Sequence, residues 1–571
     1  MKKVFIIPLL AFMAIAPLTG CQNRSNNNSG NDPKNVEPLD LGDKFNAEYY
    51  PKPEDNNVAN IVGKSSSKMR IDIAINYEGS EDAWDVVARE YERLCGGIVE
   101  VKLITGLDTN SYTERLRNEE VNPNTDWDIV QGNLMNDPEA HAVNLRSTVQ
   151  SSKNPYAGNK TWADFLEEEA YITDKSGGTD FCYFLNSENL STAWFVNTAA
   201  TAKAGITNHS PQTWDELIAM LEALQQAGYK YPMGLTLSKD GISASQFSWL
   251  LRVYGDYFFR DNYRHTTKTF DPITREDSRF EYDPTAENIE ASANFSFSYS
   301  RCLATMLDDS CEYFVGPGSD KYNDFLYQLG RLAKYIRPSA YSLSFNEVRT
   351  SFMAQADGNN GDEAPQIMLD YSGEGLAFLN ADKLKNNIDY FDYPKIESDQ
   401  VMPNTLTRDV GGNGGYLALL NYHNKKQTDL NKDFLKFFLS PYGQSIYYKA
   451  LSEKGDAPKG LTTVKNDLVL IPSEWVEFFQ TTKISFTGLA DNNSHLNLGA
   501  YKLLTSTRAM NKVVELWQGY MKPTGAITYS KFSSDILATF ISCYGDLARE
   551  YNWPADGYSS IHFNNPDYIN G

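Results

Sequence analysis

The chain has 571 residues, of which 41% are hydrophobic and 22% are charged, as is usual for a globular protein with more than one core. Its formal net charge of −22 argues against nucleic acid as a partner, because a phosphate backbone is bound by basic surfaces. The same charge argues against electrostatic docking on anionic lipid.

The N-terminus has the features of an export signal. Lys2 and Lys3 precede an apolar stretch, Val4 to Leu18, that is too short to span a bilayer comfortably. The letters LTGC, which end at Cys21, resemble the lipobox of bacterial lipoproteins, whose cysteine carries lipid such as palmitate after the preceding residues are removed. We therefore expect a lipoprotein signal peptide over residues 1–20 and a lipid anchor at Cys21. The alternative is an ordinary signal peptide with a chance cysteine.

A polar segment separates this signal from the first strand. It begins QNRSNNNSGNDPKN, which contains almost nothing to bury. We expect residues 21–67 to form a flexible tether that keeps the body near a membrane.

The folded body is predicted to begin with a βαβ unit. Ile71, Ile73 and Ile75 alternate as in a strand, an amphipathic helix with Trp84 on its apolar face follows, and residues 98–104 form a second strand. The letters DWDIVQGN then indicate another strand. Alternating strands and helices favour an α/β fold with mainly parallel sheets, in which ligands lie at the carboxyl ends of strands.

Two later segments carry clear helix signals. Thr213 is a good N-cap that can form a capping box with Glu216, and Gly228 can end the same helix in the left-handed conformation. Ser440 and Pro441 mark the junction between two further helices. Any α/β protein could contain such helices, so they indicate no function.

No motif for chemistry stands out. The six histidines are scattered, none lies in a His-Glu-x-x-His motif, and no Gly-x-Ser-x-Gly is present. Cys302 and Cys311 are close enough in sequence to be bridged in an exported protein, and free buried thiols are equally compatible with the sequence. We expect no metal, no cofactor and no catalytic residue.

Several segments, in order, resemble the solute-binding proteins of carbohydrate ABC importers, the maltose-binding and multiple-sugar-binding type. The longest is TAWFVNTAATAKAGITNHSPQTWDELIAMLEALQQAGYKYPMGL, where Val196 departs from the usual tyrosine before Asn197. VRTSFMAQADGNNGDEAPQIMLDYSGE, DFLKFFLSPYGQ and KGDAPKG resemble later parts of that family. The resemblance covers most of the chain from about Lys68.

The resemblance implies two hinge-linked lobes, each a mainly parallel sheet flanked by helices, with about three crossings between them. We expect lobe one to comprise residues 68–188 and 373–442, and lobe two residues 189–372 and 443–571. The ligand would lie between the lobes, and the closed form would be recognised by the permease subunits. The stretch from about Tyr254 to Pro317 is interpreted as an insertion.

Aromatic residues make up 13% of the chain and most of them must lie in the cores. A sugar has apolar faces that stack on rings and a hydroxyl rim that binds polar side chains. Rings placed at strand ends are therefore the candidates, together with polar residues on the same loops. The predicted ligand-binding residues are Asn76, Tyr77, Glu78, Gln131, Asn133, Trp194, Trp249, Tyr254, Asp370, Tyr371, Glu374 and Asn413.

The sequence thus predicts a lipid-anchored, monomeric binding protein, not an enzyme, on the outer face of the cell membrane, which captures a sugar or oligosaccharide for an ABC importer. Two alternatives stay open. One is an outer-membrane glycan-docking lipoprotein, a class that is mainly helical and would not begin with a βαβ unit. The other is a lipoprotein glycoside hydrolase, which the abundant carboxylates alone cannot nominate.

Overall fold

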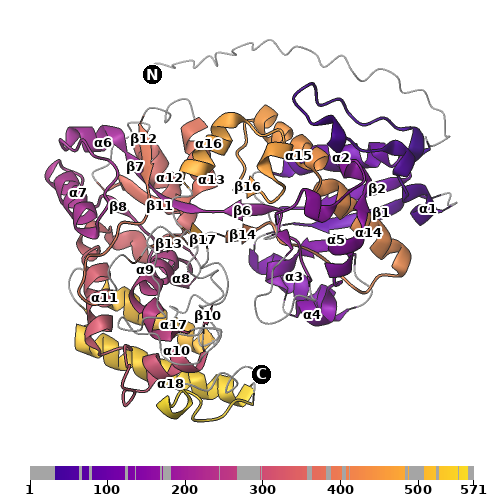
Figure 1. The fold of residues 1–571 in the computed structure, drawn as a ribbon. Coiled ribbons are helices and arrows are strands. Elements are labelled where there is room, and N and C mark those ends of the chain that lie inside the picture. The colour runs from indigo at the N-terminus through magenta and orange to yellow at the C-terminus, as the bar shows by residue number, and fades with distance from the viewer. Residues whose placement is uncertain are drawn as a thin grey trace, which may run out of the picture.

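The computed structural model of the chain describes residues 32–563 apart from 64–66, 76–79, 108, 123–125, 136, 168–169, 172–181, 244, 266–295, 298, 357–362, 381–386, 402–404, 406, 410–411, 483–485, 488–506, 523–525 and 551. Two α/β bodies lie side by side and are joined in the middle by the strands β6, β14 and β16 (Figure 1). Within the described residues, no helix combines the length and the apolar character that crossing a bilayer requires.

The first body contains a four-stranded sheet in the order β15-β3-β1-β2. Strand β1 (Met69–Ala74) pairs in parallel with β2 (Val99–Ile104) and with β3 (Ile129–Gln131), whereas β15 (Leu417–Leu419) is antiparallel to β3. The expected βαβ unit is present, because α2 (Glu81–Leu94) connects β1 to β2. Other helices of this body include α3 (Thr109–Val121), α4 (Pro138–His141), α5 (Arg146–Ser151), α14 (Lys425–Phe438) and α15 (Pro441–Lys454).

The second body contains the sheet β12-β7-β11-β8. Its central strands β7 (Thr192–Asn197) and β11 (Ile367–Tyr371) are antiparallel, β12 (Ile388–Phe391) is antiparallel to β7, and β8 (Met233–Gly234) is parallel to β11. The two-lobed α/β class is therefore confirmed, and the sheets are mixed rather than mainly parallel.

Many helices surround this second sheet. They are α6 (Thr198–Lys203), α7 (Trp214–Gln226), α8 (Lys239–Ser243), α9 (Gln246–Tyr263), α10 (Tyr299–Leu307), α11 (Asp320–Gly330), α12 (Phe345–Ala356), α13 (Ser372–Asn380), α17 (Thr507–Tyr520) and α18 (Tyr529–Glu550). Helix α16 (Ser473–Thr482) packs on α13. From the stretch interpreted as an insertion, α9 and α10 pack into the second core, and residues 266–295 lie outside the described part of the chain.

Local signals placed three helix boundaries correctly. The Glu216 N–H donates to Thr213 Oγ1 and the Thr213 N–H donates to Glu216 Oε2, each at 3.2 Å, which is the predicted capping box. Gly228 follows with φ +102°, a conformation that glycine adopts without steric cost. At the start of α15, Ser440 Oγ accepts from the Gly443 N–H at 2.9 Å.

The three crossings form one small sheet. Strand β6 (Glu188–Leu190) lies between β14 (Gly412–Gly414) and β16 (Leu461–Thr462), and both neighbours are antiparallel to it. Each strand belongs to a segment that leaves one body for the other, so the connection is a hydrogen-bonded unit and not three separate linkers (Figure 1).

The positions of these crossings differ from the lobe limits expected from the sequence. Strand β12 and helix α13 pack with β7, so the second body extends beyond residue 372. Helix α15 packs against α2, so the first body extends beyond residue 442. The limits were misplaced because the chain leaves each body at β14 and β16, later than the resemblance implied.

The N-terminal segment 32–62 is not a free tether. It forms the short helices η1 (Pro33–Asn35), η2 (Ala47–Tyr49), η3 (Pro53–Asp55) and α1 (Val58–Val62) on the first body. Phe45 is 4% exposed and Val58 is fully buried. The Leu39 N–H also donates to Tyr442 Oη at 2.6 Å. The sparse apolar residues of this segment thus join the core, and residues 21–31 and 64–66 of the expected tether lie outside the described chain.

Of the two alternatives for the cysteines, free thiols are observed. Cys95, Cys182, Cys302, Cys311 and Cys543 are all buried and unbridged.

Candidate functional site

Three aromatic rings gather where β11 ends in the second body. Tyr371 is the last residue of β11, Trp249 comes from α9 and Phe345 begins α12. The ring centroids of Trp249 and Tyr371 are 4.7 Å apart, and Phe345 meets Trp249 edge to face at 5.5 Å. Trp249 is 3% exposed, whereas Tyr371 and Phe345 are only partly buried. Trp249 therefore supports the two rings that retain exposed surface.

The same strand end carries a charged group. Asp370 is fully buried and accepts from Arg349 Nε and Nη2, both at 2.8 Å. Glu374, one turn into α13, lies 3.6 Å from Arg349 Nη1. Burial raises the pKa of Asp370 to about 6, although the Arg349 guanidinium opposes that shift. Burial also raises the pKa of Tyr371 to about 12, so its phenol stays neutral.

The chain then passes directly to the crossings. Ser191 Oγ of the first crossing donates to Ser372 Oγ at 2.7 Å, and the Ser372 N–H donates to the Ser191 carbonyl at 2.9 Å. A Cβ atom on Gly373 would meet the Lys459 backbone at 2.5 Å, so only glycine permits this approach of α13 to the third crossing. The aromatic cluster thus lies beside the junction of the two bodies.

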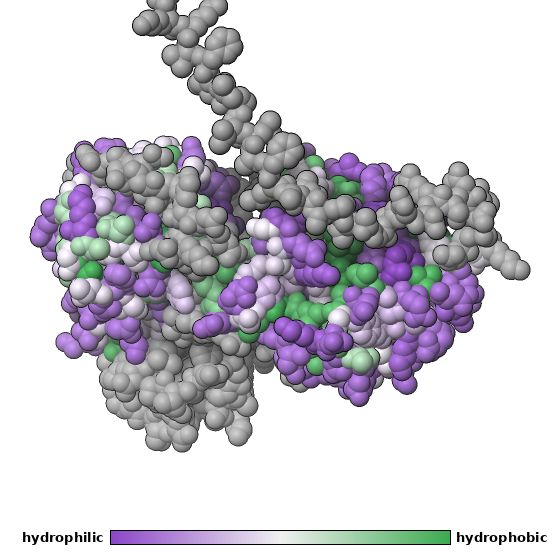
Figure 2. Space-filling model, turned by 90° about the horizontal axis from the view of Figure 1, so that it is seen from above, coloured by the Kyte–Doolittle hydropathy of each residue, from purple (hydrophilic) through white to green (hydrophobic). Residues whose placement is uncertain are grey.

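In the first body, Gln131 is the last residue of β3, as Tyr371 is the last residue of β11 in the second body. Its N–H donates to Tyr112 Oη at 2.9 Å, and Tyr112 Oη donates to the Ala74 carbonyl at 2.8 Å. Its side-chain Oε1 is buried and accepts no hydrogen bond from the described part of the chain. Asn133 follows, exposed, on η4 (Gly132–Leu134). Seen from above, hydrophobic surface gathers on the first body next to the junction, and hydrophilic residues dominate its outer rim (Figure 2).

Two predicted ligand-binding rings are core residues instead. Trp194 is fully buried in β7 and lies parallel to Phe391, with centroids 6.0 Å apart. Tyr254 is fully buried in α9, where its hydroxyl donates to the Pro394 carbonyl at 3.0 Å. Both rings fill the interior between the second sheet and its helices, so neither presents a face to solvent.

The remaining predicted residues lie wholly or partly outside the described part of the chain. Asn76, Tyr77 and Glu78 lie outside the described residues. The backbone of Asn413 pairs with Asn189 in the crossing sheet, and its side chain lies outside the description.

Two residues at the junction were not predicted from the sequence as site residues. One is Arg349, which binds Asp370 and lies 4.6 Å over the Phe345 ring. The other is Glu188, which begins β6 and faces a cavity lined by Trp84, Ser187, Phe438, Gln444, Tyr447 and Tyr448. Arg349 lies in one of the segments that carry the family resemblance, but neither residue was selected, because each acquires its role from contacts with residues distant in the sequence.

This arrangement offers stacking faces and hydrogen-bonding groups for a neutral, hydroxyl-rich molecule. Among the described residues, no group of three or more His, Cys, Asp or Glu side chains is placed to hold a metal ion. The chemistry present at the strand ends is that of binding: rings, an amide oxygen and a carboxylate.

The comparisons with known proteins agree with this architecture. The profile of a family described as bacterial extracellular solute-binding protein matches residues 77–445. None of the curated proteins compared with the sequence matches it. A chitin oligosaccharide binding protein has a similar structure, with a TM-score of 0.52 and 16% identity over 83% of this chain and 99% of that chain. The maltose-bound protein MalE3 of T. maritima has a TM-score of 0.51 and 12% identity over 83% of this chain and 99% of its own. The protein RafE, solved in complex with raffinose, has the same TM-score of 0.51 and 12% identity over 83% of this chain and 100% of its own. At these identities the likeness concerns the fold.

Proposed function

The chain belongs to the family of bacterial extracellular solute-binding proteins, and from this we propose that it captures a sugar or oligosaccharide between its two bodies and delivers it to an ABC importer. In this proposal the protein is exported, held at the outer face of the cell membrane by lipid on Cys21, and monomeric. It binds its ligand without transforming it.

The observation that carries the carbohydrate class is the aromatic cluster at the end of β11. Tyr371 and Phe345 retain exposed surface, and the buried Trp249 ring contacts both of them. Glu374 lies in the first turn of α13, three residues after Tyr371. Rings beside a carboxylate match the two surfaces of a sugar, since the apolar faces stack and the hydroxyl rim donates hydrogen bonds. Three proteins of similar fold are a chitin oligosaccharide binding protein, a maltose-bound protein and a protein in complex with raffinose, which supports the same class.

The position of this cluster supports capture between the bodies. Tyr371 adjoins Ser372 and Gly373, which contact the first and third crossings, and Gln131 ends a strand of the first body with a buried side-chain oxygen that has no partner among the described residues. A ligand held by groups on both bodies would stabilise their closed arrangement, which is how a hinge converts binding into a signal for a permease. The β1–α2–β2 unit also favours this proposal over a mainly helical glycan-docking lipoprotein.

A saccharide screen tests the proposal. Maltose, maltotriose, raffinose, chitotriose and mannotriose are each added to the purified protein, and thermal unfolding is followed. At a concentration one hundred times its Kd, a cognate sugar should raise the free energy of unfolding by about 2.7 kcal/mol. If no saccharide of a broad panel shifts the melting temperature at millimolar concentration, the carbohydrate assignment is wrong. Turnover of a chromogenic glycoside would contradict the non-catalytic part.

A further inference from the structure

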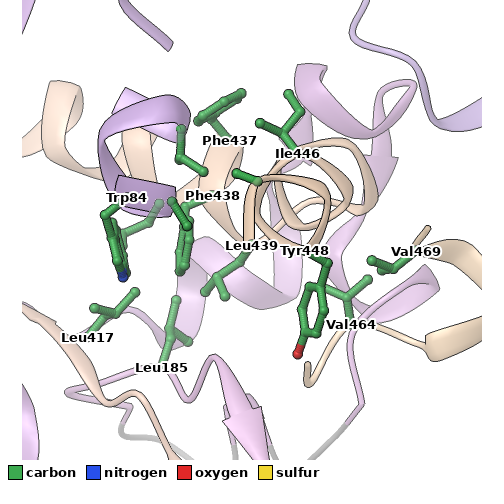
Figure 3. Packing of buried hydrophobic residues seen from close by; sticks show 14 of the residues in the cluster. Trp84, Leu185, Leu417, Phe437, Phe438, Leu439, Ile446, Tyr448, Val464 and Val469 are labelled. Carbon is green, nitrogen blue, oxygen red and sulfur yellow. The ribbon is translucent and has the colours of Figure 1, made fainter. Parts of the chain in front are cut away.

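A cavity lies where the crossing sheet meets the first body. Trp84 of α2 and Phe438 of α14 form one wall as stacked rings, with centroids 4.2 Å apart and planes 25° from parallel. Figure 3 shows these two rings face to face, with Leu185 and Leu417 beneath them. Tyr447 and Tyr448 of α15 form another wall, and Ser187 and Glu188 of the first crossing complete the lining.

This cavity is connected to all three crossings. Glu188 is in the first, and Ser187 Oγ donates to the Gly415 carbonyl of the second at 3.1 Å. Tyr448 Oη donates to the Gly460 carbonyl of the third at 2.8 Å. In Figure 3 the Tyr448 hydroxyl points away from its helix, toward the chain below it. A change of charge in this cavity therefore acts on residues that belong to, or are hydrogen-bonded to, each of the three segments that join the two bodies.

Glu188 is an ionisable residue in the lining of this cavity, and burial disfavours its charged form. Its side chain is partly buried and lines the cavity together with the rings of Trp84, Phe438, Tyr447 and Tyr448. Burial raises its pKa from 4.5 to about 7, and the charge of Lys459 on the third crossing opposes that shift. A carboxylate that faces aromatic rings depends on water or a hydrogen-bond donor to remain charged.

We propose that Glu188 is a proton-sensitive positioning residue of the hinge: the charged carboxylate holds the bodies open by requiring water in the cavity, and the neutral acid allows them to close. The inference rests on the proposed function only in assuming that the two bodies move about these crossings. It assigns to this chain a dependence of closure on pH in the range around neutrality.

The groups that face Glu188 from each packed element do not replace it as the sensor. On α15, burial raises the pKa of Tyr447 and of Tyr448, so both phenols stay neutral. On the third crossing, Lys459 supplies the opposing charge, and the pKa of Asp456 is raised by burial and by Asp82 and Glu81 at the start of α2. Gly414 of β14 and Thr462 of β16, the residues paired with Glu188, carry no charge.

The test measures the separation of the two bodies without any ligand. Spin labels are attached to Val121→Cys on α3 and Tyr327→Cys on α11, which are 75% and 61% exposed, in a chain whose Cys21 is replaced by serine. The other native cysteines are buried, so labelling is confined to the two new thiols. Distance distributions are recorded at about pH 5.5 and about pH 8, on either side of the titration of a carboxyl group near neutrality.

The proposal predicts that the distribution shifts between the two pH values in the parent protein. Glu188→Gln, which imitates the neutral acid, should give the low-pH distribution at both. Glu453→Gln is the matched control: its side chain is 67% exposed on α15, the helix that forms a wall of the cavity, and this variant should shift as the parent does. An unchanged parent distribution, or a Glu188→Gln variant that still shifts, overturns the proposal. Because no sugar is added, either result leaves the carbohydrate assignment to its own screen.

Discussion

Arg349 on α12 donates two hydrogen bonds to the buried carboxylate of Asp370 on β11, Nε to Oδ2 and Nη2 to Oδ1, both at 2.8 Å. Asp370 Oδ1 also accepts from the Tyr371 N–H at 2.7 Å. The guanidinium lies over Phe345. Arg349 thus joins the strand end to the helix that supplies a ring of the aromatic cluster, and it fixes the backbone from which Tyr371 projects.

Replacing Arg349 by alanine leaves the Asp370 carboxylate buried without its partner. The loss of one member of a buried ion pair typically costs about 3–5 kcal/mol, so we expect a large fall in the free energy of unfolding. Arg349→Lys keeps the charge but loses the two-pronged geometry, and its loss should be intermediate. Urea denaturation of both variants checks this, and an alanine variant as stable as the parent would contradict it.

Replacing Tyr371 by alanine should weaken saccharide binding by about 1–3 kcal/mol, because a stacking face is removed. Tyr371 also touches Trp249, so we expect a modest loss of stability as well. Calorimetric titration with the sugar found in the screen measures the affinity. Tyr254→Phe is the matched control, since it removes a buried hydroxyl contact in the core and should lower stability alone. Unchanged affinity in a folded Tyr371→Ala variant would remove this residue from the site.

The N-terminal segment 32–62, called the docked arm below, is predicted to contribute to the stability of the first body. Phe45→Ala should cost about 3–5 kcal/mol, the usual effect of truncating a buried phenylalanine, because its ring is 4% exposed and packs against Tyr50 and Tyr442. Leu39→Ala is the control, since that side chain is 46% exposed while its backbone N–H keeps the bond to Tyr442. Equal stability of the two variants would show that the arm does not contribute to the fold.

The docked arm also shows where sequence patterns stop being informative. Thr213 and Glu216 were predictable because a capping box is made by residues three apart. The burial of Phe45 was not predictable, because its partner Tyr442 lies almost four hundred residues away and no periodic pattern indicates the contact. Tyr371 was placed correctly at a strand end by the apolar run before it, whereas Trp194 and Tyr254 were misplaced as site residues. A ring near the end of an element has the same sequence signal whether it faces solvent or the core.

The same reason explains the missed charged groups. Arg349 and Asp370 are 21 residues apart on different elements, and Glu188 lies in an otherwise unremarkable strand. The packing of α12 on β11 gives Arg349 and Asp370 their environment, and residues of α2 and α15 that line the cavity with Glu188 give it its environment.

Lipid attachment is predicted at Cys21, which lies outside the described residues. Cys21→Ser should move the protein from the membrane fraction to the soluble fraction, because the substitution removes the proposed site of lipid attachment. Fractionation followed by immunoblotting measures this, and the parent protein treated identically is the control. A serine variant that stays as firmly in the membrane fraction would refute the lipid anchor.

The stability of the folded protein should also depend on the protonation of Glu188. Its pKa is raised from 4.5 to about 7 on folding, so between these values the folded state binds the proton more tightly than the unfolded chain does. The contribution of Glu188 to stability is therefore most favourable below about pH 4.5 and falls as the pH rises toward 7, above which the full loss remains. Glu188→Gln cannot lose a proton, so its stability relative to the parent should increase from about pH 5 to about pH 7 and level off above that. Urea denaturation of the two proteins across this range, with Glu453→Gln as the exposed control, measures the difference directly. A difference that does not vary with pH would mean that the Glu188 carboxyl ionises in the folded protein as it does in water, and it would remove the physical basis for a proton-sensitive hinge.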